Sequence, residues 1–316
     1  MGKIFDALEK SKEKHNASAA FDGTHDAAAS AKVDREDYAK QPVSLYKDIK
    51  VADASSKRIN NVEDLKQVSR TTSFAQAEVL YDDNLIDKNM VTLLKPQSFE
   101  AEQFKILRTK LLFPSSGKSP RTIMVTSTVP DEGKSLISAN LAISIAQSIQ
   151  EYVLLIDCDI RRPSIHTKFG FGNMPGLSDH LSRGIPVSSL ILKTKVNKLS
   201  ILPGGTLRHN PSELVASQQM SKLLQEVKYR YSDRFIVIDS APPKLTAEAS
   251  ALSRQVDGVL LVIEYGRTSR EMVLDLVNII GKEKIIGVVF NKLDMQFAHY
   301  YGLGKYKAYS KYYQRY

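Results

Sequence analysis

The stretch that most constrains the fold is a short apolar run followed by a polar loop and a helical pattern. Ile123–Val125 has the character of a buried strand, and the loop after it ends on Gly133-Lys134-Ser135. A strand, a loop closing on Gly-Lys-Ser and a helix form the setting in which backbone N–H groups and a lysine bind phosphate. Thr128 stands where the leading glycine of such loops is expected. The stretch predicts a phosphate-binding loop, with an ordinary strand–turn–helix connection as the alternative.

Three carboxylates are predicted at the same edge of the sheet as this loop. Val153–Ile156 and Phe235–Ile238 are apolar runs of strand length; the first leads into Asp157 and Asp159, and the second into Asp239. In an open α/β sheet, ligands bind beyond the carboxyl ends of the strands. A lysine, a serine hydroxyl and three acids there suit a magnesium–triphosphate site. Taken singly, each acid is also explained as a solvated strand end or a helix cap.

Composition and charge bound the class of protein. The chain has 316 residues, 42% hydrophobic and 25% charged, as is ordinary for a soluble globular protein. Its single cysteine, Cys158, excludes an internal disulfide, and no apolar run is long enough for a membrane span. Residues 1–90 carry a net charge of −2 and the remainder +11. A basic catalytic half would face nucleotide phosphates, anionic lipid or nucleic acid, and the lack of a nucleic-acid motif makes the last least favoured.

The first 90 residues are expected to lie outside the ordered domain. Residues 1–15 carry a short amphipathic helical pattern, compatible with a docking helix and equally with a frayed terminus. Residues 16–90 are rich in Ala, Ser and Asp without periodicity, which indicates a largely flexible linker. The ordered domain is expected at 91–295, starting near Val91, with a separate tail at 296–316.

From Val91 onward the pattern alternates between strands and helices. Besides the strand before the loop, strands are expected at 152–157, 199–202, 234–239, 258–263 and 285–290, and helices at 99–112, 246–254 and 269–281 and between 210 and 230. This alternation predicts an α/β fold of the P-loop NTPase type, with a mostly parallel sheet covered by helices on both faces.

Two shorter motifs each leave two interpretations open. Arg161 and Arg162 follow the paired acids and would either neutralise phosphate charge or bind surface carboxylates. Asn291-Lys292-Leu293-Asp294 matches the base-reading motif of GTP-binding switches. Asn291 would therefore either hydrogen-bond a purine or serve as a turn residue.

The end of the chain is rich in tyrosine. Of 14 tyrosines, seven lie in the last 17 residues, interspersed with Lys and Arg that give this tail a charge of +4. They are Tyr300, Tyr301, Tyr306, Tyr309, Tyr312, Tyr313 and Tyr316. Aromatic rings among basic residues would either stack on single-stranded nucleic acid or present hydroxyls as phosphate acceptors.

Together these motifs resemble the bacterial tyrosine autokinases of capsule and exopolysaccharide biosynthesis. The resemblance covers about residues 98–316. Pro130–Ser135 is similar to the family's variant Walker A loop, Leu155–Pro163 to its Walker A′ motif, and Val237–Asp239 to Walker B. The tyrosine cluster closes the chain as it does in these kinases.

The resemblance implies that the γ-phosphoryl group of ATP is transferred to tyrosines on the tails of neighbouring subunits. Lys134 would hold the β- and γ-phosphates, and Asp157 would orient or deprotonate the attacking tyrosine. Ser135, Asp159 and Asp239 would hold Mg²⁺ directly or through water. Nucleotide contacts are expected from Thr128, Pro130, Asp131, Glu132, Gly133, Lys134, Ser135, Leu136 and Asn291.

The resemblance also implies partners. Glu102, Lys105 and Arg108 occupy the family's Glu-x-x-Arg-x-x-Arg oligomerisation motif, with Lys in place of the middle Arg, and point to a homo-oligomeric ring. From the residues alone, a solvated charged helix face is the commoner explanation of such a pattern. A separate membrane-spanning chain-length regulator and a cognate tyrosine phosphatase are expected. The chain itself is expected in the cytoplasm, recruited to the inner face of the membrane by a partner.

The main alternative is a partitioning or division-site ATPase of the same fold, without kinase activity. Those proteins carry an extra lysine in the loop, at the position that is Val129 here, and they lack a tyrosine-rich tail. A GTPase is a further alternative, which predicts that GTP outcompetes ATP.

Overall fold

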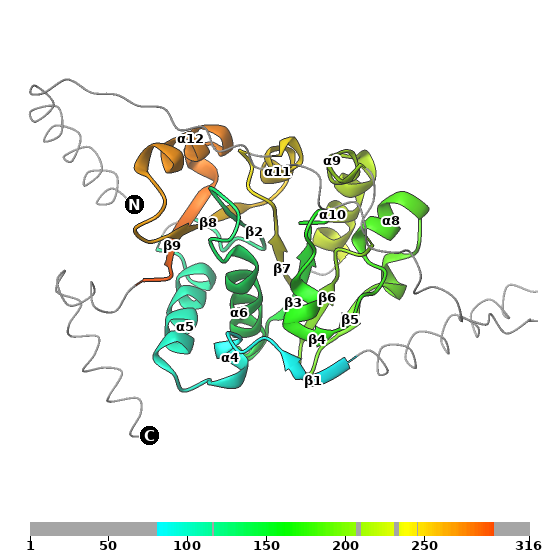
Figure 1. The fold of residues 1–316 in the computed structure, drawn as a ribbon, viewed down its shortest axis with the longest axis horizontal. Coiled ribbons are helices and arrows are strands. Elements are labelled where there is room, and N and C mark those ends of the chain that lie inside the picture. Colours follow the sequence, from blue (N-terminus) through cyan, green and yellow to red (C-terminus); the bar gives the residue numbers. More distant parts are fainter. Residues whose placement is uncertain (1–80, 116, 207–209, 231–233, 245, 294–316) are drawn as a thin grey trace, which may run out of the picture. The chain divides into compact units, whose positions relative to one another are not determined.

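The computed structural model describes residues 81–293, apart from 116, 207–209, 231–233 and 245 (Figure 1). Its strands are β1 (Tyr81–Ile86), β2 (Thr122–Ser127), β3 (Tyr152–Asp157), β4 (Phe169–Phe171), β5 (Leu192–Lys193), β6 (Leu199–Leu202), β7 (Arg234–Asp239), β8 (Gly258–Glu264) and β9 (Ile285–Asn291). Its helices are α4 (Val91–Leu94), α5 (Phe99–Leu112), α6 (Lys134–Ala146), α7 (Ile165–Lys168), α8 (Leu177–Arg183), α9 (Pro211–Val215), α10 (Gln218–Arg230), α11 (Ala247–Ser253) and α12 (Arg270–Ile280), with 3-10 turns η1 (Val187–Ser189) and η2 (Lys282–Lys284). The predicted helix at 1–15 and the tyrosine tail lie outside the described residues.

A seven-stranded sheet in the order β5-β6-β3-β7-β2-β8-β9 forms the centre of the fold. Every pair of neighbours runs parallel except β5 and β6. The carboxyl ends of β2, β7 and β3 therefore lie next to one another at one edge. The predicted α/β fold with a mostly parallel sheet is confirmed.

Helices cover both faces of this sheet, as the alternation of buried side chains requires (Figure 1). In β2, Ile123 and Val125 face a core formed with α5 and α6, whereas Met124 faces a second core formed with α8 to α12. Strands buried on both faces read as continuous apolar runs, which is why β2, β3 and β7 could be located from the sequence. Burying one large aliphatic side chain contributes about 1.5–3 kcal/mol.

The ordered domain starts earlier than the predicted boundary near Val91. β1 pairs antiparallel with β4, with Ile86 opposite Phe169, and Met90 is fully buried in the α5–α6 core. The linker assignment for 16–90 was therefore wrong for its last ten residues. The sequence Tyr81–Ile86 is mostly polar, and its partner strand is only three residues long, so neither carries a hydrophobic pattern long enough to predict a strand.

The helix before the loop forms as predicted. Ser98 accepts a hydrogen bond from the backbone N–H of Ala101 and so caps the start of α5. Within the part of the chain that the structure describes, no helix is both long and apolar enough to cross a membrane.

Candidate active site

The loop between β2 and α6 has the backbone geometry of an anion site. α6 starts at Lys134, directly after Gly133 at φ 92°. A Cβ on Gly133 would lie 2.1 Å from Nδ2 of Asn291, so only glycine fits this left-handed position. The N–H groups of the first turn of α6 have no partner within the helix, and they favour negative charge. The loop therefore presents donors where a phosphate would bind.

Lys134 is held among carboxylates at the start of α6. Its Nζ lies 2.7 Å from Oδ2 of Asp159 and 3.5 Å from the hydroxyl of Ser135. Burial by itself would lower the pKa of Lys134, but the charges of Asp239 and Asp159 outweigh it and raise the pKa above its ordinary value. Lys134 is therefore a fixed positive charge at neutral pH.

Asp157 and Asp239 form a buried pair of like groups behind Lys134. They are opposite each other in the parallel pairing of β3 and β7, and both are fully buried. Oδ2 of Asp157 accepts from the N–H groups of Ser164 and Ile165 at 2.9 and 3.0 Å, and Oδ1 of Asp239 accepts from the hydroxyl of Ser138 at 3.2 Å. Burial, together with the charge of Asp239, raises the pKa of Asp157 to about 8. Burial likewise raises the pKa of Asp239, against the opposing charge of Lys134.

These residues fit a magnesium ion that also binds phosphate. Oδ1 of Asp157 and Oδ2 of Asp239 are buried and have no hydrogen-bond partner among the described residues. A buried carboxylate oxygen without a donor is costly, and a cation would satisfy it. Among the same residues no cluster of three or more His, Cys, Asp or Glu is arranged to hold a metal by itself. Mg²⁺ usually binds one or two carboxylates and completes its shell with water and substrate phosphates, so the donor set suffices.

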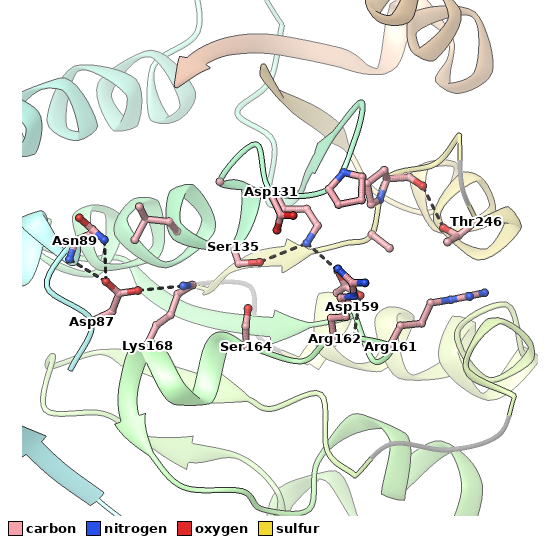
Figure 2. A pocket seen from close by; sticks show the side chains of 16 residues that line it. Asp87, Asn89, Asp131, Ser135, Asp159, Arg161, Arg162, Ser164, Lys168 and Thr246 are labelled. Carbon is pink, nitrogen blue, oxygen red and sulfur yellow. Dashed lines mark hydrogen bonds and ion pairs between the residues drawn. The ribbon is translucent and has the colours of Figure 1, made fainter. Parts of the chain in front are cut away.

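A cavity of about 620 Å³ opens in front of the loop (Figure 2). It is lined by Asp87, Asn89, Pro130, Asp131, Gly133, Lys134, Ser135, Leu136, Asp159, Arg161, Arg162, Ser164, Lys168, Ala241, Pro242 and Thr246. The lining thus includes most of the predicted nucleotide contacts. Sequence analysis missed Asp87, Asn89 and Lys168: the first two lie in the presumed linker, and an ion pair of 3.1 Å joins Asp87 to Lys168.

Thr128 and Glu132 are directed into the loop rather than into the cavity. One oxygen of the Glu132 carboxylate accepts from the N–H and hydroxyl of Thr128, both at 2.7 Å, and from the N–H of Val129 at 2.9 Å. Its other oxygen accepts from the N–H of Glu264 at 3.1 Å and from the hydroxyl of Thr268. Burial opposes ionisation, but these hydrogen bonds prevail and hold the pKa of Glu132 below its ordinary value. The Glu132 carboxylate therefore holds the loop backbone in place at Thr128, the position where such loops usually carry their leading glycine.

Asn291 lies behind the loop and does not line the cavity. Its Nδ2 donates to the carbonyl of Glu132 at 2.8 Å. The next residue, Lys292, donates from Nζ to the carbonyl of Asp131 at 2.8 Å and pairs with Glu264 at 3.1 Å. The last residue of β9 and the residue after it thus both donate to the loop backbone, and base reading by Asn291 stays a prediction.

The predicted oligomerisation residues make contacts within the chain. Glu102 and Lys105 form an ion pair of 2.9 Å along α5. Arg108 donates to the carbonyl of Ser144 at 2.8 Å, near the end of α6. Their role between subunits stays a prediction.

A phosphate loop at the start of a buried helix, facing carboxylates from two adjacent parallel strands, defines a P-loop nucleotide-binding protein. Residues 123–302 match the family described as the CobQ/CobB/MinD/ParA nucleotide binding domain. The tyrosine-protein kinase YwqD of Bacillus subtilis is 32% identical over 208 residues, covering 65% of this chain and 86% of that protein. The succinoglycan biosynthesis transport protein ExoP of Rhizobium meliloti is 34% identical over 228 residues, 69% of this chain and 29% of that protein.

Solved structures agree with these relatives. The kinase domain of the Escherichia coli tyrosine kinase ETK aligns with a TM-score of 0.59 at 28% identity, over 65% of this chain and 82% of that domain. The chain belongs to the bacterial tyrosine-protein kinases of capsule and exopolysaccharide biosynthesis, within the CobQ/CobB/MinD/ParA nucleotide-binding domain family. The partitioning-type ATPase without kinase activity is not favoured.

Proposed function

We propose that this tyrosine-protein kinase transfers the γ-phosphoryl group of magnesium-bound ATP to the C-terminal tyrosines Tyr300–Tyr316 of neighbouring copies. One observation carries the proposal: Lys134, fixed to Asp159 at the helix start, faces the buried carboxylates of Asp157 and Asp239, whose free oxygens lack partners among the described residues. This combines a phosphate site with a cation site in one place.

Each side chain has a role that follows from its position. Lys134 would bind the β- and γ-phosphates, and the first-turn N–H groups of α6 would orient them for in-line transfer. Ser135, Asp159 and Asp239 would hold Mg²⁺, which when bound neutralises charge on the phosphates. Asp159 lines the cavity, whereas Asp157 is fully buried and tied to Ser164 and Ile165. Of the two carboxylates, Asp159 is thus the one that a group in the cavity can reach directly.

A mixing experiment tests transfer between copies. A chain with Lys134→Met and an intact tail is incubated with Mg²⁺, ATP and a chain whose seven tail tyrosines are changed to Phe. Phosphotyrosine mapped by mass spectrometry is expected on the tail of the Lys134→Met chain only when both are present. Phosphotyrosine confined to other residues, or tail phosphotyrosine on the Lys134→Met chain when it is incubated without the Tyr→Phe chain, would reject the proposal. Lys244→Met, which removes an exposed lysine paired with Asp275, is the matched control.

Assembly and partners follow from the same proposal. We propose a homo-oligomeric ring that uses Glu102, Lys105 and Arg108, activated by a separate membrane-spanning chain-length regulator and reversed by a tyrosine phosphatase. Each phosphate adds about −1.5 to −2 charges to a tail of +4, so phosphorylation should loosen the ring by repulsion. Light scattering on phosphorylated chain and on the Tyr→Phe tail variant measures this, and equal masses for the two would contradict it.

A further inference from the structure

The cationic side chains that line the cavity differ in whether a carboxylate already neutralises them. Lys134 pairs with Asp159 at 2.7 Å, and Lys168 with Asp87 at 3.1 Å. Arg161 pairs through Nε with Glu248 at 3.0 Å. For the guanidinium of Arg162 the structure gives no hydrogen bond or ion pair with any described residue.

The two neighbouring arginines therefore have different environments. Arg161 is held by buried Glu248 and also donates to the hydroxyl of Ser212, so its guanidinium serves the packing of α9 and α11. Figure 2 shows the side chain of Arg161 extending away from Asp159, whereas the backbone N–H of Arg162 donates to the Asp159 carboxylate. The sequence left open whether these arginines bind phosphate or protein carboxylates; among the described residues, Arg161 has a carboxylate partner and Arg162 has none.

Arg162 is fixed next to the lysine of the loop by its own backbone. Its N–H donates to Oδ1 of Asp159 at 3.3 Å, and Oδ2 of the same carboxylate binds Lys134. Asp159 thus links the phosphate-binding lysine to the start of the Arg162 side chain. The Arg162 side chain, whose guanidinium has no partner among the described residues, lines the same cavity as the loop residues Gly133 and Ser135.

A triphosphate bound in the cavity would be stabilised by a further cation. Lys134 already faces three carboxylates, and the loop position at which related ATPases carry a second lysine is Val129. A triphosphate brings more negative charge than one Mg²⁺ neutralises. We propose that Arg162 binds the terminal phosphoryl group of the nucleotide and stabilises its charge during transfer; this rests on the function proposed above. An arginine in this role accelerates phosphoryl transfer by about 10³–10⁵-fold in other enzymes.

In the transfer, the bond from the γ-phosphorus to the ADP oxygen breaks as the bond to the tyrosine oxygen forms. The tyrosine proton passes to a cavity carboxylate, and ADP leaves with the electron pair of the broken bond. Arg162 makes and breaks no covalent bond; its N–H groups donate to the equatorial phosphoryl oxygens.

Nucleotide affinities test this directly, without requiring activity. Dissociation constants for a non-hydrolysable ATP analogue and for ADP, each with Mg²⁺, are measured by calorimetry for wild type, Arg162→Ala and Arg161→Ala. Arg162→Ala should weaken the triphosphate analogue by about tenfold and ADP by less than about twofold. Arg162→Lys should fall between, because lysine keeps the charge but lacks the planar fork.

Arg161→Ala is the matched control and should give the opposite pattern. It leaves Glu248 buried without its partner, so the melting temperature should fall while the ratio of the two affinities is unchanged. For Arg162→Ala the melting temperature should be unchanged, since the side chain is exposed.

Three outcomes would overturn the assignment. Equal affinities in Arg162→Ala and wild type, or equal weakening of both nucleotides, would show that Arg162 does not contact the terminal phosphate. A normal affinity ratio with a raised KM for an acidic or phosphorylated acceptor peptide would show that it binds the acceptor. Wild-type chain that binds neither nucleotide would instead reject the proposed function itself.

Discussion

The two sides of the phosphate loop differ in how fully their polar groups are satisfied. Behind the loop, both oxygens of Glu132 accept hydrogen bonds, and Asn291 and Lys292 donate to loop carbonyls. In front of it, Asp157 and Asp239 each keep one buried oxygen without a partner among the described residues. We call these sets the back and the front of the loop, the front also including Lys134, Ser135 and Asp159.

The difference indicates a division of labour. The back completes its hydrogen bonds within the chain, so it acts as a rigid scaffold. The front gathers like charges at a cost in stability, as the raised pKa values of Asp157 and Asp239 show. Such an arrangement is expected where a bound cation and phosphate complete the site. Substitutions on the two sides should therefore have opposite effects on stability.

The largest effect is expected at the front, from Asp239→Asn. The rate of phosphotyrosine formation should fall about 10²–10³-fold, because the variant lacks a carboxylate that we propose holds Mg²⁺. The melting temperature without nucleotide should nevertheless rise by about 2–4 °C, since a buried charge with a raised pKa is removed. A variant within tenfold of wild-type activity, or one that melts lower than wild type, would break the comparison.

The corresponding change at the back is Glu132→Ala. Loss of the buried carboxylate leaves donors of Thr128, Val129 and Glu264 without an acceptor, which should lower the free energy of unfolding by roughly 3 kcal/mol. The melting temperature should fall by roughly 6–12 °C. Glu132→Gln, which retains one acceptor oxygen, should lose less. If both variants melt like the wild type, the back is not a scaffold.

The pH dependence of stability tests whether Asp157, at the front of the loop, is protonated in the folded chain. Folded chain keeps the proton of Asp157 up to about pH 8, whereas the unfolded chain releases it near pH 3.8. Between these values the folded state binds more protons, so this group makes the free energy of unfolding fall as the pH rises, and the effect levels off above pH 8. The stability advantage of Asp157→Asn over wild type should therefore grow from pH 5 to pH 8.5 by at least about 1.4 kcal/mol. Denaturant titrations measure it, and a constant difference would contradict the buried proton.

The smallest effect is expected from Asn291→Ala at the back. It removes one hydrogen bond to the carbonyl of Glu132, which is worth about 1 kcal/mol. Because Asn291 does not line the cavity and its Nδ2 is engaged, the ratio of ATP to GTP affinity should not change. Competition binding with the two nucleotides measures this ratio, and a shift towards either base would assign Asn291 to base recognition.

The fold could be predicted from the sequence wherever a buried element has a local run of apolar residues. β3, β6 and β7 have the predicted bounds. β3 and β7 are buried on both faces and are continuous apolar runs, and three of the four residues of β6 are apolar and buried. β1 and β4 could not be predicted, since their stability comes from pairing with each other across the chain. A mostly polar strand with a distant partner has no local signature.

The residues of the site could be predicted from the sequence, but not which of them support the loop and which line the cavity. Lys134 starts α6, Asp157 and Asp239 end β3 and β7, and Asp159 follows Asp157 by two residues, so the local pattern located all four at the same sheet edge. Glu132 looked like a nucleotide contact, but the partners that reveal its role, Glu264 and Thr268, are 132 and 136 positions away. Arg161 and Arg162 are adjacent and chemically alike, and only the fold shows that one of them has a carboxylate partner.

Thermal melting with ADP, with and without Mg²⁺, tests the central claim that the front of the loop is a magnesium–nucleotide site. At about 100 times the dissociation constant, binding contributes about 2.7 kcal/mol, so Mg²⁺ and ADP together should raise the melting temperature by roughly 5–10 °C. The rise should be smaller with EDTA and absent in Lys134→Met. An unchanged melting temperature in wild type, or an equal rise in Lys134→Met, would contradict it.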